Sequence, residues 1–451
     1  MKTDSTLIIS PSGVRGVVGK GLSPDIVAKL ACAFGKMMGE KILVGYDTRT
    51  SNDMFKYAVF SALLSVGCNV VDLGICPTPS LQLMIKEMGA NGGIVITGSH
   101  NPPEWNALKF VRGDGLFLFP EEGKNLIDIY REDTVKLSPW DRLGKLSKDN
   151  SAIPRHIKKV IQLVDCEKIK VKRFKVVVDA CNGAGAFATP LLLEKLGCEV
   201  VKLNCEAKGN FAHLPEPVPH NLQDLSRIVK EVGADIGFAQ DADADRLALV
   251  SERGEALSEE YTLMLACNFV LQNKKGLVVT NVSTSRAIDD IAAKFSCPVK
   301  RTPVGDIHVS RCMREKGAVI GGEGNGGVIF PPLNYARDGI MAAALILNHL
   351  ANENISLSSL VDSLPRYYML KQKIKNLRVD FEKLKQSLRS DFSSHELDFT
   401  DGVKILLPEG WIHIRASGTE PVLRVIAEAK DKKTAENLSR LALDKIFSFR
   451  K

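Results

Sequence analysis

Short runs rich in valine and isoleucine alternate with longer stretches of helical pattern, and this alternation limits the fold more than any other feature of the chain. Each run is too short for a buried helix and precedes a segment with apolar residues at helical spacing. The runs occupy residues 41–47, 92–100, 174–180, 234–241, 276–282 and 317–323. Strands that alternate with helices in this way are typical of parallel α/β sheets. We therefore predict an α/β fold.

The apolar runs form three pairs, and in each pair the first run ends in a polar turn while the second ends in a loop of different chemistry. This repeat predicts three related α/β domains with mixed, largely parallel sheets, whose functional loops lie at the carboxyl ends of strands. After residue 366 a charged helix, alternating strands and an amphipathic last helix indicate a smaller α+β domain. We expect domains over residues 1–150, 151–252, 253–366 and 367–451, arranged around a central cleft.

Length, composition and charge restrict the class of protein. The chain has 451 residues with 45% hydrophobic and 25% charged residues, which disfavours disordered, fibrous and membrane proteins. The net charge of +7 is spread along the chain without a nucleic-acid-binding motif, so we expect no nucleic-acid partner. No apolar run is long enough for export or for a membrane span, and the ten cysteines form no CxxC pair. We expect a cytoplasmic protein with reduced thiols, either a monomer or a homodimer.

The loop over residues 97–103, with the sequence TGSHNPP, directly follows a predicted buried strand. A glycine- and proline-limited turn there would hold the hydroxyl of Ser99 at a fixed point above the sheet, as nucleophilic catalysis requires. His100 and Lys109 are candidates for handling protons or phosphate charge. The alternative is a turn without chemistry.

Asp241, Asp243 and Asp245 alternate in a loop between two apolar strands. Three carboxylates that converge in this way repel one another unless they hold a hard cation, so the pattern predicts a metal site. An EF-hand is excluded because Arg246 stands where that loop needs glycine and Leu249 replaces an oxygen ligand. A solvated acidic turn is the remaining alternative.

Two further loops have compositions suited to a phosphorylated sugar. In residues 321–327 (GGEGNGG), Gly322 would let the backbone approach a ligand, and Glu323 and Asn325 offer polar groups for sugar hydroxyls. No GxxxxGK[ST] motif occurs, which disfavours a nucleotide P-loop.

The other loop, residues 415–421 (RASGTEP), joins two alternating strands and is suited to bind phosphate. The predicted phosphate ligands are Arg415, Ser417, Gly418 and Thr419, with Arg424 as reinforcement. A β-hairpin turn with a surface arginine is the alternative.

These four loops together resemble the α-D-phosphohexomutase family, whose members share TxSHNP, DxDxDR, GExxGx and RxSGTxP motifs in this order. The resemblance covers essentially the whole chain. It implies that Ser99 is the phosphoserine and that Asp241, Asp243 and Asp245 hold Mg²⁺, with the phosphoserine of Ser99 completing the metal shell. It further implies exchange between a sugar 1-phosphate and 6-phosphate through a 1,6-bisphosphate that turns over within the site.

Arg15, Lys109 and Arg246 match other active-site positions of the family. The resemblance implies that Lys109 carries a proton or stabilises charge and that Arg15 and Arg246 give electrostatic help. Ordinary salt bridges are the alternative for all three.

Departures from the family pattern bear on the choice of sugar. Residues 325–327 are Asn-Gly-Gly where many members have Ser-Gly-His, so no histidine role transfers to this loop, although His308 lies upstream. The SGTEP form of the phosphate loop favours glucosamine phosphate, while the Asn-Gly-Gly ending resembles less selective members and leaves mannose and glucose phosphates open. Two rival functions remain: a phosphosugar phosphatase and a phosphosugar-binding protein without turnover.

Overall fold

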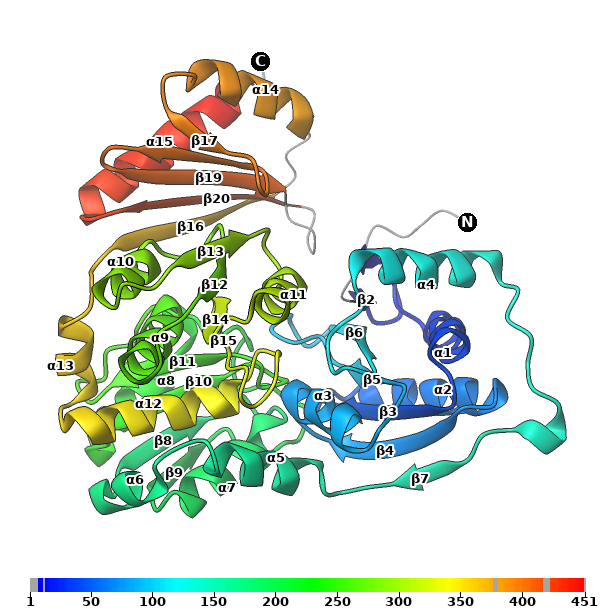
Figure 1. Ribbon diagram of the computed structural model, residues 1–451. Coiled ribbons are helices and arrows are strands. Elements are labelled where there is room, and N and C mark those ends of the chain that lie inside the picture. The colour runs from blue at the N-terminus through cyan, green and yellow to red at the C-terminus, as the bar shows by residue number, and fades with distance from the viewer. Residues whose placement is uncertain (1–6, 11–12, 376–379, 417–421, 450–451) are drawn as a thin grey trace.

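The computed structural model describes residues 7–10, 13–375, 380–416 and 422–449. They form four domains, shown in Figure 1 from domain I in blue and cyan to domain IV in orange and red. Domains I to III each contain an α/β sheet, and domain IV contains an antiparallel sheet covered by helices on one side. This architecture confirms the predicted fold class. Among the described residues, no helix has the length and apolar character needed to cross a membrane.

Domain I contains a seven-stranded sheet in the order β1-β2-β6-β5-β3-β4-β7. Its strands are β1 (Ile8–Ser10), β2 (Gly13–Val17), β3 (Lys41–Tyr46), β4 (Asn69–Ile75), β5 (Gly92–Ile96), β6 (Trp105–Arg112) and β7 (Leu146–Lys148). Its helices are α1 (Pro24–Met38), α2 (Asn52–Ser65), α3 (Thr78–Glu87) and α4 (Pro120–Glu132), and a 3₁₀ turn, η1 (Trp140–Arg142), precedes β7.

Domains II and III each contain a four-stranded sheet. Domain II comprises α5 (Ala152–Ile161), α6 (Cys166–Lys172), β8 (Lys175–Asp179), α7 (Gly185–Lys195), β9 (Glu199–Leu203), η2 (Pro219–Asn221), α8 (Gln223–Val232), β10 (Ile236–Gln240) and β11 (Leu247–Ser251). Domain III comprises α9 (Glu260–Asn273), β12 (Val278–Asn281), α10 (Ala287–Lys294), β13 (Val299–Thr302), α11 (Asp306–Lys316), β14 (Ile320–Glu323), β15 (Gly327–Ile329), α12 (Gly339–Glu353) and α13 (Leu357–Asp362).

Domain IV has five strands in the order β16-β20-β19-β18-β17. Its elements are β16 (Tyr368–Lys375), α14 (Phe381–Asp391), β17 (Glu396–Asp398), β18 (Val403–Leu407), β19 (Gly410–Ala416), β20 (Val422–Ala429) and α15 (Lys432–Ser448). It has a hydrophobic core of its own, to which Leu438 of α15 and Ile412 of β19 contribute. The alternating pattern of the last strands predicted this sheet.

The first three domains repeat one strand arrangement. In each, three strands are parallel and an antiparallel strand borders them: β6-β5-β3-β4, β11-β10-β8-β9 and β15-β14-β12-β13. The segment that leads into the antiparallel strand therefore has the same place in all three domains. These equivalent segments are residues 97–104, 241–246 and 324–326. The first two contain Ser99 and the three aspartates, and the third completes the glycine-rich loop.

Helix α12 joins domains II and III. Almost every one of its side chains is buried, as expected for a helix that is apolar all round. It contacts α5, α6 and α7 of domain II and α9 of its own domain. Its N-cap is Asp338, whose Oδ1 accepts hydrogen bonds from the backbone N–H groups of Ile340 and Met341 at 2.9 Å each. The helix thereby fixes the end of the segment that precedes it relative to both domains.

A buried hydrogen-bonded chain connects domains I, II and III. Ser80 of α3 lies 2.8 Å from Nδ1 of His156 on α5, and Nε2 of His156 lies 2.7 Å from Oδ2 of Asp338. All three residues are buried. Because each domain contributes one member, the chain fixes the three domains relative to one another.

Candidate active site

Ser99 lies in the turn after β5 with a φ of 48°, a left-handed conformation that few non-glycine residues adopt. Its side chain is buried, and its Oγ donates a hydrogen bond to Oδ2 of Asp241 at 2.9 Å. Its backbone N–H donates to Oγ1 of Thr97 at 2.9 Å. The turn thus holds the Ser99 hydroxyl against the acidic loop of domain II.

Arg49 holds the Ser99 turn from behind. Its guanidinium donates at 2.7–2.9 Å to four carbonyl oxygens, those of Ser99, Asn101, Pro102 and Trp105. Asp47 in turn accepts hydrogen bonds from Arg49 Nε at 3.1 Å and from Thr97 Oγ1 at 2.6 Å. Sequence reasoning noted the polar turn that contains both residues but gave them no role, since a buried arginine bonded to distant carbonyls has no local pattern.

The three aspartates predicted to bind metal lie together in a buried cluster. One carboxylate oxygen from each of Asp241, Asp243 and Asp245 lies within 4.8 Å of the others. Oδ1 of Asp243 and Oδ1 of Asp245 are buried and accept no hydrogen bond from the described residues. A buried carboxylate oxygen without a donor is costly, and hard divalent cations prefer such ligands. The donor set therefore fits a divalent metal ion.

Nearby charges shift the pKa values of Asp241 and Asp243 in opposite directions. Burial, together with the charges of Asp245 and Asp243, raises the pKa of Asp241 well above its ordinary value. Burial would also raise the pKa of Asp243, but Lys109 and the Thr78 hydroxyl lower it below its ordinary value. Burial opposes the charge of Lys109, yet the two aspartates outweigh it and raise the pKa of Lys109.

The structure brings the other predicted catalytic side chains to the same cleft. Arg246 Nε lies 3.9 Å from Oδ2 of Asp241 and 3.8 Å from Oδ1 of Asp245. Arg15 donates to Oδ1 of Asn101, beside Ser99, at 3.4 Å. Burial and the surrounding cations, Arg246 first, lower the pKa of His100 well below its ordinary value. His100 is therefore neutral at pH 7.

The carboxylate of Glu323 at the end of β14 is held by four donors. Asn281 Nδ2 and the Gly305 N–H donate to Oε1 at 2.8 and 3.0 Å. Arg337 Nη1 and Asn325 Nδ2 donate to Oε2 at 2.8 and 3.4 Å. Burial opposes ionisation, but Arg337 and the bonds from Asn281 and Gly305 lower the pKa of Glu323. The bond from Asn325 is the longest of the four, so it is the most easily exchanged for a ligand hydroxyl.

The glycine-rich loop also packs on the start of β11, directly after the acidic loop. Gly326 has a φ of 87°, and its carbonyl oxygen accepts a hydrogen bond from the Leu247 N–H at 3.0 Å. A side chain there would meet the backbone of Leu247, so glycine is required. Gly322, the predicted close-approach position, is paired with Val328 within the β14–β15 ladder.

Domain IV contributes a row of cations. Lys373 is paired with Arg424 on β16 and β20, and Arg424 is paired with Arg415 on β20 and β19. All three line the cleft, and Arg415 Nε donates to Oδ2 of Asp401 at 3.0 Å. Like charges opposite one another destabilise a sheet, so such a row indicates a site for an anion. Ser417, Gly418 and Thr419 lie outside the described residues.

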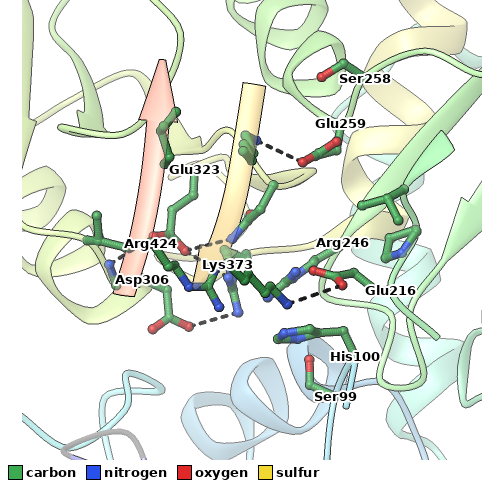
Figure 2. A pocket seen from close by; sticks show the side chains of 18 of the residues that line it. Ser99, His100, Glu216, Arg246, Ser258, Glu259, Asp306, Glu323, Lys373 and Arg424 are labelled. Carbon is green, nitrogen blue, oxygen red and sulfur yellow. Dashed lines mark hydrogen bonds and ion pairs between the residues drawn. The ribbon is translucent and has the colours of Figure 1, made fainter. Parts of the chain in front are cut away.

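All four domains line one cleft of about 740 Å³. Figure 2 shows Ser99 and His100 on one side of it, with Lys373 and Arg424 projecting toward them from the strands of domain IV. A ligand in this cleft would touch both the cationic row and Ser99, whose hydroxyl contacts the acidic cluster. That combination suits an anionic substrate whose phosphoryl group is transferred.

Models of the phosphoglucomutase/phosphomannomutase family match the chain in order. The α/β/α domains I, II and III match residues 7–136, 154–254 and 258–368, and the C-terminal domain matches residues 369–444. The fold and the site thus define a phosphoryl-transfer enzyme of the isomerase class. The chain belongs to the phosphoglucomutase/phosphomannomutase family of α-D-phosphohexomutases, as the sequence predicted.

The chain is similar to mutases from several organisms over nearly its whole length. The chain is 40% identical over 441 residues to the phosphoglucomutase/phosphomannomutase of Thermococcus kodakarensis, covering 96% of each chain. It is 37% identical over 434 residues to the probable phosphoglucosamine mutase of Methanopyrus kandleri, covering 95% of each. The crystal structure of a phosphoglucomutase/phosphomannomutase family protein from Burkholderia thailandensis is 28% identical, with a TM-score of 0.86 over 98% of this chain and 97% of that one.

Proposed function

We propose that this phosphohexomutase interconverts glucosamine 6-phosphate and glucosamine 1-phosphate through a phosphoserine at Ser99 and a 1,6-bisphosphate intermediate. The observation that carries the proposal is the 2.9 Å hydrogen bond from Ser99 Oγ to Asp241 Oδ2 at the floor of a cleft lined by cations. In the transfer, the bond between phosphorus and Ser99 Oγ breaks and a bond to the free sugar hydroxyl forms.

We assign Mg²⁺ to the cluster of Asp241, Asp243 and Asp245, with the phosphorylated Ser99 as a further ligand. The unpartnered Oδ1 atoms of Asp243 and Asp245 support the assignment, because Mg²⁺ takes carboxylate oxygens as ligands. When bound, the ion supplies positive charge that stabilises the phosphoryl group during transfer.

Proton handling falls to His100, which lines the cleft and is neutral at pH 7 because its pKa is lowered by burial and by the charge of Arg246. It accepts the proton of the attacking sugar hydroxyl, and this proton then returns to the Ser99 Oγ that the phosphoryl group has left. The reverse direction runs the two proton transfers backwards. Lys109 is held in ion pairs with its pKa raised, so it stabilises charge. Arg15 and Arg246 add positive charge around the reacting group.

Sugar hydroxyls are held by Glu323 and Asn325, and the bond from Asn325 to Glu323 opens so that Asn325 can bind the substrate. Gly322 belongs to the same proposed site as the backbone position beside Glu323. The phosphate that does not react is held by the cationic row of Lys373, Arg424 and Arg415. Ser417, Gly418 and Thr419 belong to the same proposed site. Since either phosphate of the bisphosphate fits this row, turning the intermediate presents the other one to Ser99.

The name of the Methanopyrus kandleri relative supports glucosamine phosphate as substrate, while the name of the Thermococcus kodakarensis relative supports glucose and mannose phosphates as alternatives. Carboxylates of Asp306 and Glu323 line the cleft. A protonated amino group at the sugar is attracted by such carboxylates, which favours glucosamine.

Turnover of glucosamine 6-phosphate, mannose 1-phosphate and glucose 1-phosphate with Mg²⁺ and a trace of the matching 1,6-bisphosphate tests the proposal. Wild type should isomerise glucosamine 6-phosphate fastest, Ser99→Ala should be inactive, and Ser61→Ala on the exposed face of α2 should match wild type. Release of free phosphate would indicate a phosphatase. Ligand binding without turnover in the wild type would indicate a binding protein.

Three further proposals concern the domain boundaries, the cellular location and the oligomeric state. We propose domain boundaries near residues 150, 252 and 366. The matches to the family models, which begin at residues 154, 258 and 369, support this proposal. We propose a cytoplasmic location, supported by ten cysteines that are all free thiols. We also propose that the protein acts as a monomer or homodimer, since all the groups named above come from one chain.

A further inference from the structure

Arg337, between β15 and α12, pairs with carboxylates from three separate segments. Its Nη2 donates to Oδ2 of Asp245 at 2.6 Å, and its Nη1 donates to Oε2 of Glu323 at 2.8 Å. Nη2 also lies 3.3 Å from Oδ2 of Asp306 at the start of α11. The Arg337 side chain is only 9% exposed and lines the cleft. One guanidinium therefore connects the acidic loop of domain II to the glycine-rich loop of domain III.

The position of Arg337 depends on the absence of a side chain at residue 327. A Cβ atom on Gly327 would overlap Cδ of Arg337 and lie 3.0 Å from its Cγ. The stem of Arg337 thus occupies the space into which a side chain at residue 327 would extend. Arg337 reaches this space from the segment before α12, whose start is fixed by Asp338 and the buried chain through His156.

The contacts of Arg337 also determine which oxygen of Asp245 is left without a donor among the described residues. Its bond occupies Oδ2 of Asp245 and leaves Oδ1 of the same carboxylate without a donor among the described residues. At the same time it occupies Oε2 of Glu323, where Asn325 makes the longest of the four bonds. The planar fork of a guanidinium suits two carboxylates at a fixed separation, which the single ammonium of lysine does not.

We propose that Arg337 is a positioning residue that sets the separation between the metal-binding Asp245 and the sugar-binding Glu323. The inference rests on the proposed function of these two loops and adds a residue that no motif singled out. By fixing that separation, Arg337 places the sugar hydroxyl relative to Ser99. A displacement of about 1 Å in such a geometry lowers the rate of the chemical step by roughly 100-fold, while the substrate still binds.

Steady-state kinetics of Arg337→Met and Arg337→Lys, with saturating Mg²⁺, test the role in turnover. We expect kcat to fall by about 100-fold in Arg337→Met with KM changed by less than about threefold. Arg337→Lys should recover part of the loss because it can hold one carboxylate. Arg155→Met removes another ion-paired arginine, partnered with Glu87 outside the cleft, and should match wild type. A raised KM with unchanged kcat, or unchanged kinetics, would overturn the proposal.

A second measurement does not depend on activity or on metal. In metal-free protein, Gly327→Ala should lower the midpoint of thermal unfolding by roughly 4 °C, because the added methyl group overpacks against Arg337. In the Arg337→Ala background the same change should have a smaller effect, because the methyl group then meets only Oδ1 of Asn325, at 3.0 Å, among these neighbours. Equal shifts in both backgrounds would refute the spatial relationship.

The two measurements separate failure of this inference from failure of the proposed function. Absence of isomerisation in the wild type would sink the proposed function, and with it the role of Arg337 in turnover. A coupled pair of shifts together with wild-type kinetics in Arg337→Met would leave the function standing and overturn only the positioning role.

Discussion

Lys109 on β6 places its Nζ 2.6 Å from Oδ2 of Asp243 and 3.6 Å from Oδ2 of Asp245. The cation comes from domain I and the carboxylates from domain II, and all three groups are buried. These two ion pairs of Lys109 therefore join the strand that follows the Ser99 turn to the acidic loop.

Lys109→Met should destabilise the metal-free protein by about 3 kcal/mol, because it leaves buried carboxylates without their cation. Mg²⁺ should restore part of this loss by replacing the missing positive charge. Thermal unfolding with and without Mg²⁺ measures both effects. Lys56→Met, which removes an ion pair to the exposed Asp53, should change stability by less than about 1 kcal/mol. Equal losses with and without Mg²⁺ would argue against compensation at this site.

Arg49→Lys should lower kcat by about 100-fold, because a single ammonium cannot hold the four carbonyl oxygens that fix the Ser99 turn. Substrate affinity should change little, since Arg49 does not line the cleft. Steady-state kinetics with Arg227→Lys, an exposed arginine on α8, as the control provide the comparison. Retained kcat would mean that the turn holds its shape without the guanidinium.

Lys404 gives domain IV a pH-dependent contact with domain III. Its Nζ donates to the carbonyl oxygen of Val282 at 2.8 Å and lies 4.0 Å from the ring centroid of Trp411. Burial, with the charge of Arg301, lowers the pKa of Lys404 to about 7. The unfolded chain keeps the ordinary value of about 10.4, so between these two values the unfolded state binds more protons. This group therefore makes the protein more stable as pH rises from 7 toward 10, and contributes no pH dependence below about 6.

Removing Lys404 should abolish that contribution. The difference in unfolding free energy between wild type and Lys404→Met should move by about 2 kcal/mol in favour of wild type from pH 7 to pH 9. Urea denaturation at several pH values measures it. A constant difference over this range would show that Lys404 keeps its ordinary pKa in the folded protein.

His156→Leu should destabilise the protein by about 3 kcal/mol, because it leaves buried polar atoms of Ser80 and Asp338 without their shared partner. Ser80→Ala removes only one bond at the end of the chain and should cost about 1 kcal/mol. Denaturant unfolding of both variants tests this order. Turnover should also fall in His156→Leu, because the hydrogen-bonded chain that connects the three domains is then broken. The reverse order of stabilities would contradict the role of His156 as the central member.

The sequence predicted the parts of the structure that local pattern determines. The apolar runs became β3, β5, β8, β10, β12 and β14. Three of the four predicted functional loops follow β5, β10 and β14. β11 was expected as the apolar strand after the acidic loop, but β6 and β15 were not expected individually. The antiparallel direction of all three strands depends on pairing within the folded sheet. Arg49 and Arg337 were also missed. Their partners include residues at least 50 and 92 positions away, so their burial arises only when distant segments meet.

The shared place of the three loops has a consequence for redesign. Each loop connects a central strand to its antiparallel neighbour, and each belongs to a separate domain with the same strand arrangement. Residue 325 can therefore be exchanged for that of another mutase, with Gly326 kept, while the anchors of residues 97–104 and 241–246 stay in place. Arg337 limits the position directly after this loop, because a side chain at residue 327 would overlap Cδ of Arg337 and needs a smaller residue at 337. New sugars are best sought with libraries at residue 325 combined with paired changes at residues 327 and 337.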